Sequence, residues 1–585
     1  MYIKIKLLLT KKAFFISAFL LLYTLFVFIL FFPIFTAKTF IFPYALKPFD
    51  ICETHSELWL ILKFLYIFFH ILFSIIISNI IYKFLIKKSK LASYNPPSTI
   101  DDYTENLSLF IGLDDKTNKK IYIPEKGLYQ NILITGTIGT GKTSSSMYPF
   151  AKQLIEYKSS IFNDKLGILV LDVKGNFHKQ IYEYAKKNNR IQDLIIIDLN
   201  GKIKYNPLDK PHLKPHILAN RLKTILTLFS SNNSDSYWLD KAEQVIGECI
   251  KLCRLYNNEY VTFVELHNLI NTPDYYSQKL LYLRKLFQSG KLSSKQIYDL
   301  KSSIEFFENE FVKLDSRVLS ILKSEITRIT NTFISDYDVL HTFCPKKEEI
   351  NFFGFEDVIK KGKIVVLNMN ISEYLNLSKI IAAYLKLDFQ GEVLMQLSNN
   401  SPTRPVAFIC DEYHEYVTST DANFFSQSRE AKCINIVATQ SYTSLLNTLK
   451  DQSSVKVITQ SLINKLWFRS DDTFTIEDAQ KQIGKEDKTK LSKSISENAQ
   501  ETNFNYFTGK LKSKNSSVSE TVSSYIHSDY IYDTNYFTQN LETFSCLGFI
   551  SDGNIIQRPC KIKMIPYFKE SPCTNDYIYS KDKII

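Results

Sequence analysis

One short stretch constrains the fold of this chain more than any other. Residues 132–143 read Ile-Leu-Ile-Thr-Gly-Thr-Ile-Gly-Thr-Gly-Lys-Thr, and from Gly136 to Thr143 they match the pattern G-x-x-x-x-G-K-[ST]. An apolar run typical of a buried strand precedes the pattern and a helical pattern follows it, which is the context that a P-loop requires. The chain has only 17 glycines, so a chance match is rare. We therefore expect a P-loop here rather than a glycine-rich turn with an incidental lysine.

The residue types in this loop are those that phosphate binding needs. Glycines let the backbone curl so that its N–H groups point at phosphate oxygens, and the helix N-terminus adds a partial positive charge. Lys142 is expected to reach the β- and γ-phosphates of ATP, and the Thr143 hydroxyl is expected to bind Mg²⁺. The predicted nucleotide contacts are Gly136, Thr137, Ile138, Gly139, Thr140, Gly141, Lys142, Thr143 and Ser144.

A second motif supplies the acidic partners of such a loop. Residues 406–412 read Val-Ala-Phe-Ile-Cys-Asp-Glu, an apolar strand that ends in two acids, as in a Walker B motif. We expect Asp411 to hold Mg²⁺ through water and Glu412 to polarise the attacking water as the general base. Alone this motif is weak, because strands often end in polar turns. Together with the P-loop it predicts a Mg²⁺-dependent ATPase.

Two further residues are candidates for the catalytic centre. Gln440 follows a predicted strand at 434–439, and ligands of parallel sheets gather at the carboxyl ends of the strands, so Gln440 is placed to sense the γ-phosphate. Arg429 is predicted to lie on the helix before that strand. Taken alone it is either a solvated surface side chain, which is the commoner role of an isolated arginine, or a finger that stabilises transition-state charge in a neighbouring subunit.

Apolar runs without alternation recur along the chain and are typical of buried parallel strands. They cover residues 131–135, 167–172, 194–198, 364–368, 406–411, 434–439 and 465–469. Helical patterns separate several of them, so we expect an α/β fold with a parallel sheet covered by helices. Between 212 and 333 the strand pattern fades, which predicts an all-α inserted domain. The nucleotide-binding domain then consists of residues 95–211 and 334–585.

The C-terminal hundred residues change in character. After Gly484 a stretch rich in Ser, Lys and Asn extends to about 524, which predicts exposed loops or a hairpin. Strand patterns return near 545–550 and 561–566.

Two long apolar runs predict an N-terminal transmembrane anchor, residues 1–94. The runs, at about 13–35 and 58–86, are each long enough as a helix to cross a hydrocarbon layer ~30 Å thick. Lysines flank the outer ends of both runs, whereas the loop between them holds two lysines and three acids. The positive-inside rule then predicts two spans with both termini in the cytoplasm. A cleaved signal peptide is disfavoured, because the first run is too long and no small-residue cleavage site follows it.

Net charge does not identify a nucleic-acid-binding protein here. The chain carries a formal net charge of +11, but residues 1–90 hold eleven lysines and three acids and so account for +8 of it. The other 495 residues hold 60 basic and 57 acidic side chains. Lys174, Lys223 and the lysines between 485 and 493 could line a channel, although charge runs are more often solvated faces. The nine cysteines form no CxxC pair and no zinc-type spacing, as is usual in a reducing cytoplasm.

Two other classes of P-loop protein lack their signatures in this sequence. The chain contains no Gly-Gly dipeptide, which excludes the LSGGQ signature of ABC transporters. Asn118-Lys119 and Asn464-Lys465 are not followed by the aspartate of the guanine-binding motif Asn-Lys-x-Asp. The motifs therefore favour neither an ABC transporter nor a GTPase.

With these motifs in this order, the chain resembles the VirD4/TraG/TraD family, the type IV secretion coupling proteins of bacterial conjugation. The resemblance covers nearly the whole chain, from the two-helix anchor to Gln440. The more specific similarities are Asp172-Val-Lys174-Gly175-Asn176 to a D-x-K-G-acid motif, Tyr205-Asn206-Pro207-Leu208 to an N-P-L segment, Trp238 and Ala242 to a W-x-x-x-A motif, Arg429 to the arginine finger, and Gln440-Ser441 to a Q-[SA] motif. The chain departs from the family pattern where Asn176 replaces an acid and where Thr137 takes a place often held by proline.

The resemblance implies a RecA-like motor domain that assembles as a hexamer on the bacterial inner membrane, with ATP between subunits and Arg429 completing the neighbour's site. It also implies delivery of single-stranded DNA–relaxase complexes, effector proteins or both to a type IV secretion channel. Two alternatives stay open. A FtsK/HerA-like duplex-DNA translocase shares the fold, and a nucleotide-switched membrane receptor platform would bind nucleotide tightly with negligible turnover.

Overall fold

A computed structural model of the chain describes residues 20–24, 107–199, 202–228, 236–272, 274–398, 404–498, 504–505, 510–511 and 517–569, with single positions between Glu57 and Ile76. The chain divides into two compact units, Met1–Asn95 and Pro96–Ile585. Among the described residues, no helix combines the length and the apolar character that a membrane span needs. The predicted spans at 13–35 and 58–86 lie largely outside the described residues.

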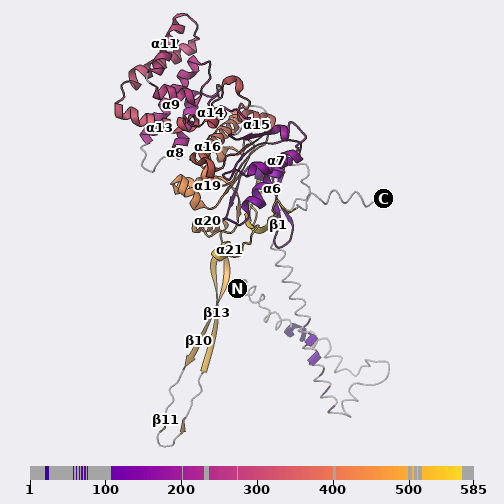
Figure 1. The fold of residues 1–585 in the computed structure, drawn as a ribbon. Coiled ribbons are helices and arrows are strands. Elements are labelled where there is room, and N and C mark those ends of the chain that lie inside the picture. The colour runs from indigo at the N-terminus through magenta and orange to yellow at the C-terminus, as the bar shows by residue number, and fades with distance from the viewer. Residues whose placement is uncertain are drawn as a thin grey trace, which may run out of the picture. The chain divides into compact units, whose positions relative to one another are not determined.

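The described part of Pro96–Ile585 is built around an 11-stranded sheet in the order β2-β1-β15-β14-β9-β3-β8-β7-β4-β6-β5 (Figure 1). The strands from β9 to β5 are parallel neighbours. They are β3 (Ile132–Thr135), β4 (Gly167–Leu171), β5 (Leu194–Ile197), β6 (Ile364–Leu367), β7 (Val406–Cys410), β8 (Cys433–Thr439) and β9 (Asn464–Trp467). Each lies within two residues of a predicted strand, so the prediction of a parallel sheet is confirmed.

Alternate side chains of these strands contribute to separate cores on opposite faces of the sheet. One core contains the buried faces of α6 and α7, and the other contains those of α15, α16 and α17. These helices are α6 (Tyr148–Glu156), α7 (Phe177–Lys187), α15 (Phe355–Lys361), α16 (Ile371–Met395) and α17 (Asp421–Gln427). Because the strands are buried on both faces, their sequences are continuously apolar rather than alternating.

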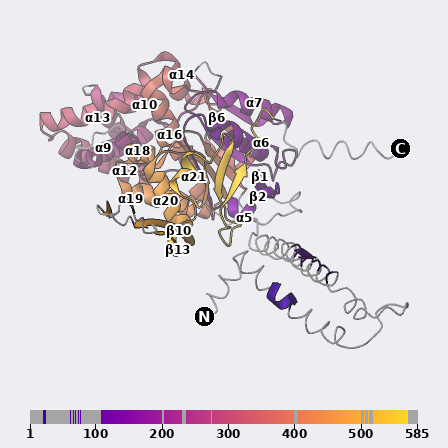
Figure 2. The same cartoon turned by 90° about the horizontal axis from the view of Figure 1, so that it is seen from below.

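Antiparallel strands continue the sheet beyond β9. In sheet order they are β14 (Ser545–Phe549), β15 (Cys560–Lys563), β1 (Ser108–Asp114) and β2 (Lys120–Pro124). Segments far apart in the sequence therefore lie side by side, as the yellow and indigo strands in Figure 2 show. The patterns near 545–550 and 561–566 correctly predict β14 and β15, whereas β1 and β2 are not among the predicted strands.

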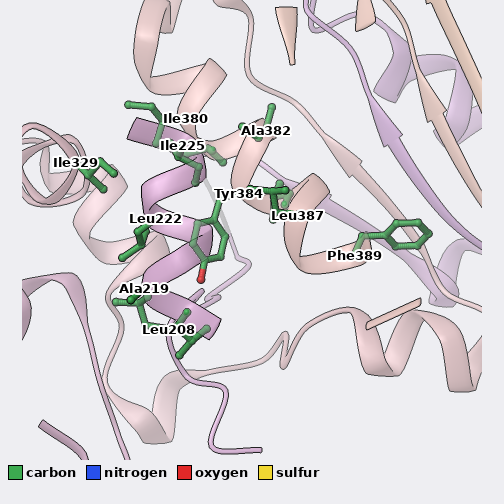
Figure 3. Close-up of a cluster of buried hydrophobic side chains, with 14 of the residues drawn as sticks. Leu208, Ala219, Leu222, Ile225, Ile329, Ile380, Ala382, Tyr384, Leu387 and Phe389 are labelled. Carbon is green, nitrogen blue, oxygen red and sulfur yellow. The ribbon is translucent and has the colours of Figure 1, made fainter. Parts of the chain in front are cut away.

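Between β5 and β6, over residues 215–343, the described residues form helices and no strand. The helices are α8 (Pro215–Leu228), α9 (Ser236–Tyr256), α10 (Phe263–Asn271), α11 (Tyr275–Gln288), α12 (Ser294–Ile304), η3 (Glu305–Phe311), α13 (Ser316–Ile334) and α14 (Tyr337–Phe343). Helix α16 joins them to the sheet, because its side chains belong to one core with both. Figure 3 shows Tyr384 of α16 beside Leu222 of α8. The hydroxyl of Tyr384 also donates to the carbonyl of Pro207 at 2.9 Å.

A long two-stranded ribbon follows α20 (Thr473–Ile483). Strand β10 (Lys485–Asn498) pairs antiparallel with β13 (Ser517–Tyr530), and the ribbon projects from the end of α20 next to α21 (Thr534–Thr538) (Figure 1). The sequence predicts either exposed loops or a hairpin after Gly484, and the protein forms the hairpin.

Candidate nucleotide site

The predicted P-loop begins at the carboxyl end of β3 and leads into a helix. Gly139 and Gly141 have φ of 80° and 91°, a region that side chains with a Cβ rarely adopt. At Gly141 the ring of Phe544 also leaves no room for a Cβ. The loop is followed by a π-helical turn, η1 (Thr143–Met147), which continues into α6. The chain thus forms the strand, loop and helix that bring backbone N–H groups and a helix N-terminus together.

Lys142 lies inside this loop, with only 7% of its surface exposed. Its Nζ donates to the carbonyl oxygen of Gly136 and, at 3.2 Å, to that of Thr137. Burial lowers the pKa of Lys142, whereas the carboxylates of Glu412 and Asp411 raise it. The ammonium therefore shares one electrostatic environment with the two acids of the second motif.

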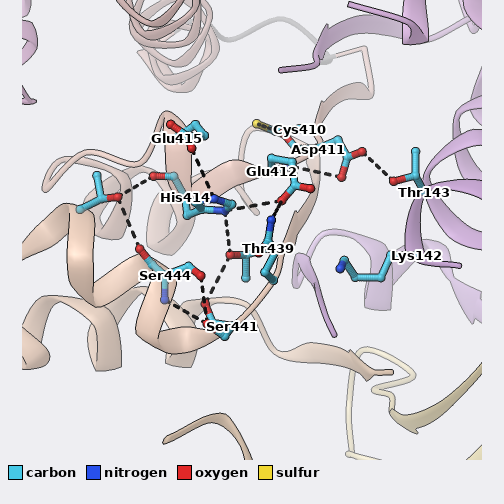
Figure 4. A network of polar contacts seen from close by, with 12 residues as sticks. Lys142, Thr143, Cys410, Asp411, Glu412, His414, Glu415, Thr439, Ser441 and Ser444 are labelled. Carbon is cyan, nitrogen blue, oxygen red and sulfur yellow. Dashed lines mark hydrogen bonds and ion pairs between the residues drawn. The ribbon is translucent and has the colours of Figure 1, made fainter. Parts of the chain in front are cut away.

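The P-loop and the second motif are in direct contact. The Thr143 hydroxyl donates to Oδ2 of Asp411 at 2.8 Å, although the two residues are 268 positions apart (Figure 4). The contact forms because β3 and β7 both run parallel to β8, which lies between them, so their carboxyl ends meet at one edge of the sheet. The two predicted Mg²⁺ ligands therefore lie side by side.

Glu412 and Gln440 also meet at this edge. Nε2 of Gln440 donates to Oε2 of Glu412 at 3.3 Å. Glu412 is only 8% exposed, and its backbone is left-handed with φ of 48°, an uncommon conformation for a residue other than glycine. The Gln440 carbonyl also accepts a bond of 3.2 Å from the N–H of Gly136, so Gln440 connects the P-loop to the candidate general base.

Three carboxylates gather at the site. Burial, and then the neighbouring charges of Glu412 and Asp172, raise the pKa of Asp411 to about 6. A cluster of hard oxygen donors that resists ionisation favours a bound cation, and a Thr hydroxyl with a carboxylate is a donor set that suits Mg²⁺. The residues present thus fit the predicted cofactor. Among the described residues, no group of three or more His, Cys, Asp or Glu side chains is arranged to hold a metal ion, so the Thr143 hydroxyl is part of the predicted Mg²⁺ donor set.

The turn after β4 contributes Lys174, which the motifs do not predict as a site residue. Asp172, only 3% exposed, accepts bonds from the N–H groups of Lys174, Asn176 and Phe177 at 2.9–3.0 Å and so fixes the turn. Nζ of Lys174 then lies 3.4 Å from Oε1 of Glu412. Burial lowers the pKa of Lys174, but Asp411 and Glu412 outweigh it and raise the pKa.

His414 is a second unpredicted neighbour of Glu412. Its Nδ1 lies 3.7 Å from Oε2 of Glu412 and 3.2 Å from the hydroxyl of Thr439 at the end of β8 (Figure 4). Burial lowers the pKa of His414. Each oxygen of Glu412 therefore has a polar neighbour from a different segment of the chain.

Arg429 lies apart from these residues. It is exposed and follows the end of α17, in the turn that precedes β8. The prediction that it lies on a helix is therefore wrong, because the helix ends at Gln427. Arg429 precedes the amino end of the seven-residue strand β8 and Gln440 follows its carboxyl end, so a strand about 20 Å long separates them.

Comparison with known proteins finds coupling proteins among the matches. Residues 405–529 match the family model described as the TraM recognition site of TraD and TraG. The chain is also 22% identical over 389 residues to the type 4 coupling protein DotL of Legionella pneumophila subsp. pneumophila. That match covers 59% of this chain and 48% of DotL, so it spans about half the length of this relative.

Solved structures show the fold. The plasmid coupling protein TrwB, in complex with a non-hydrolysable ATP analogue, matches with a TM-score of 0.50 at 12% identity, over 82% of this chain and 96% of TrwB. TrwB in complex with ADP and Mg²⁺ matches with a TM-score of 0.48 at 11% identity, over 82% and 96% of the two chains. The first match confirms the predicted RecA-like α/β fold. The family-model match and the coupling-protein relative confirm the predicted resemblance to the VirD4/TraG-type coupling proteins.

Proposed function

We propose that this chain is a membrane-anchored, ATP-driven coupling protein that delivers macromolecules to a type IV secretion channel. The observation that carries the proposal is the meeting of three segments at one sheet edge. There Thr143 contacts Asp411 at 2.8 Å, and Gln440 contacts Glu412 at 3.3 Å. A phosphate-binding loop beside paired acids and a sensing amide is the arrangement that ATP hydrolysis needs.

In this proposal each residue has a defined task. The backbone N–H groups of the P-loop bind the phosphates, and the Lys142 ammonium neutralises charge on the β- and γ-phosphates. Glu412 accepts the proton of the attacking water, and its exposed fraction of 8% keeps bulk water away from that carboxylate. Gln440 contacts Glu412 and the P-loop backbone together, so it can report the γ-phosphate to both.

Thr143 and Asp411 are the residues that would hold Mg²⁺. When bound, the ion would supply charge neutralisation at the phosphates and orientation of the nucleotide. The direct contact of their oxygen atoms supports this assignment, because both donors already face one point.

Arg429 is proposed to act in a neighbouring subunit of a homo-oligomer, the hexamer that the family resemblance implies. The placement of Arg429 supports the proposal, because this exposed arginine lies at the opposite end of β8 from its own chain's site. An arginine supplied across a subunit boundary is a common way to complete such a centre.

The proposed location is the bacterial inner membrane, with two spans at 13–35 and 58–86 and both termini in the cytoplasm. The charge distribution of residues 1–90 supports this orientation. The proposed cargo is a single-stranded DNA–relaxase complex, effector proteins or both. The match to the model of a TraM recognition site supports contact between residues 405–529 and a partner protein of the TraM kind.

ATP turnover by the detergent-purified full chain tests the proposal. We expect Mg²⁺-dependent hydrolysis that single-stranded DNA or a cargo protein stimulates, together with loss of hydrolysis in Lys142→Ala and Glu412→Gln. Matched controls are Lys152→Ala on α6 and the exposed Glu430→Gln, which should turn over ATP normally. Tight nucleotide binding with negligible turnover would favour the receptor platform instead. Stimulation by duplex DNA alone would favour a FtsK/HerA-like translocase.

A further inference from the structure

An aromatic cluster lies against the P-loop and takes no part in the phosphate chemistry. Its members are Tyr148 on α6, Phe544 before β14, and Tyr567 and Phe568 after β15. The ring of Tyr567 meets that of Tyr148 at a centroid distance of 5.1 Å and that of Phe568 at 5.5 Å. Phe544 and Phe568 are 5.9 Å apart. These four side chains form the aromatic cluster.

Backbone hydrogen bonds attach the cluster to the loop. The N–H of Tyr567 donates to the carbonyl of Ser144 at 2.8 Å, and the N–H of Phe544 donates to the carbonyl of Thr140 at 3.0 Å. The ring of Phe544 also packs directly behind Gly141. The cluster and the phosphate-binding loop are therefore held as one local unit.

Two rings of the aromatic cluster remain exposed although each contacts other rings. Tyr567 keeps 44% of its surface exposed and Phe568 keeps 60%. Aromatic side chains usually bury most of their area, so an exposed pair that a binding loop holds in place offers a surface to a ligand.

The sheet order shows which part of a nucleotide faces this pair. Strand β3, which carries the P-loop, lies between β8 and β9. Asp411 and Glu412 follow β7, beyond β8, so the γ-phosphate must point to that side of β3. In the aromatic cluster Phe544 precedes β14, and Tyr567 and Phe568 follow β15. Both strands lie beyond β9, on the opposite side. A nucleotide with its phosphates in the loop therefore extends its base toward the cluster.

We propose that Tyr567 and Phe568 form the stacking surface for the base of the bound nucleotide. The inference rests on the proposed function, because it takes the P-loop as the phosphate site. The ligand class is a nucleobase with a planar π face, and ring stacking needs no hydrogen-bond donor on the base. Edge contacts with Phe544 and Tyr148 hold the rings of Phe568 and Tyr567, respectively.

Binding of two ligands by the full chain in detergent tests the proposal. One ligand is a non-hydrolysable ATP analogue with Mg²⁺, and the other is inorganic tripolyphosphate with Mg²⁺, which lacks a base. Phe568→Ala should weaken binding of the ATP analogue roughly tenfold, the size expected for one lost base–aromatic stack. Tripolyphosphate binding should not change, and Phe568→Trp should restore the affinity for the analogue. Tyr298→Ala on α12, where the ring is 74% exposed, is the matched control and should behave as wild type.

The outcomes separate this inference from the proposed function. If wild-type protein binds neither ligand, the P-loop is not a phosphate site and the proposed function fails. If wild-type protein binds both ligands and Phe568→Ala leaves the affinity for the ATP analogue unchanged, the stacking surface is wrong while the proposed function stands. Equal weakening of both ligands by Phe568→Ala would also overturn the inference, because the ring would then support the loop rather than contact the base.

Discussion

Lys386 and Asp421 form an ion pair in which neither side chain has any exposed surface. Nζ of Lys386 lies 2.8 and 2.6 Å from the two carboxylate oxygens and also donates to the carbonyl of Tyr416 at 2.6 Å. Two residues along α16, the buried Asp388 pairs with Arg221 at 2.6 Å and with Lys210 at 2.9 Å. Buried ion pairs therefore join α16 to two parts of the chain. Lys386 pairs with Asp421 in the segment after Glu412, and Asp388 pairs with Arg221 in the inserted helix α8.

Replacing Lys386 by methionine should destabilise the protein by about 3–5 kcal/mol, because Asp421 is left as an uncompensated buried charge. Urea unfolding at pH 7 measures the change. Adding Asp421→Asn to Lys386→Met removes that charge, so the double variant should lose less than the sum of the two single variants. Additive losses would show that the two side chains do not interact.

Lys465 should make stability depend on pH in the alkaline range. Its side chain is 4% exposed in β9, and burial lowers its pKa to about 8, only partly opposed by Asp478. The unfolded chain therefore binds a proton that the folded chain lacks between about pH 8 and 10.5, so stability contributed by this site rises with pH there. At pH 7 the buried charge costs ~3 kcal/mol, and Lys465→Met should be more stable by an amount of that order.

Thermal unfolding of wild type and Lys465→Met at pH 7 and pH 10 measures this difference. The advantage of the variant should shrink at the higher pH, because the folded wild-type lysine has then lost its charge and most of the cost of burying that charge is gone. The exposed Lys186→Met on α7 controls for the general effect of removing a lysine. A constant difference across the range would mean that Lys465 keeps its charge when buried.

The elements that the sequence predicts well are those with a strong local pattern. Strand β7 and the P-loop are each specified by consecutive residues, and their boundaries agree with the prediction within two residues. The hairpin of β10 and β13 is less certain from the sequence, because polar residues with little alternation suit both a loop and a ribbon. The sequence wrongly predicts Arg429 on a helix, because nothing in the local sequence marks the end of α17 at Gln427.

The contacts that the sequence does not predict depend on the order of strands in the sheet. Lys174 follows β4 and Glu412 follows β7, and they meet because β4 and β7 are parallel neighbours. A single sequence contains no local pattern that shows which strands are neighbours in the sheet. The D-x-K-G motif is the sequence feature that could have indicated Lys174 as a site residue. Its Asp172 fixes the turn that brings Lys174 to Glu412.

Lys174→Met should lower kcat for ATP by roughly one to two orders of magnitude, because the ammonium 3.4 Å from Glu412 compensates adjacent buried carboxylates. The affinity for a non-hydrolysable ATP analogue should stay near that of wild type, since the ion pair of Lys174 is with Glu412 rather than with a residue of the P-loop. Lys174→Arg should retain most activity, because it keeps the charge. Lys186→Met provides the matched control. A rise in KM with unchanged kcat would contradict this role and indicate a contact with substrate instead.

Mixed oligomers can show where Arg429 acts. In Arg429→Ala the chain's own loop and acids are intact, and in Lys142→Ala the arginine is intact, so each variant alone should be inactive. If Arg429 serves the neighbouring subunit, co-expressed variants form some interfaces with a complete centre, and about a quarter of wild-type ATPase activity should return on random mixing. Lys142→Ala mixed with Glu412→Gln is the matched control and should remain inactive, because both changes damage the same side of an interface. Equal inactivity of the two mixtures would mean that Arg429 does not complete a partner's site. Normal activity of Arg429→Ala alone would mean that its exposed position before β8 is that of an ordinary surface side chain.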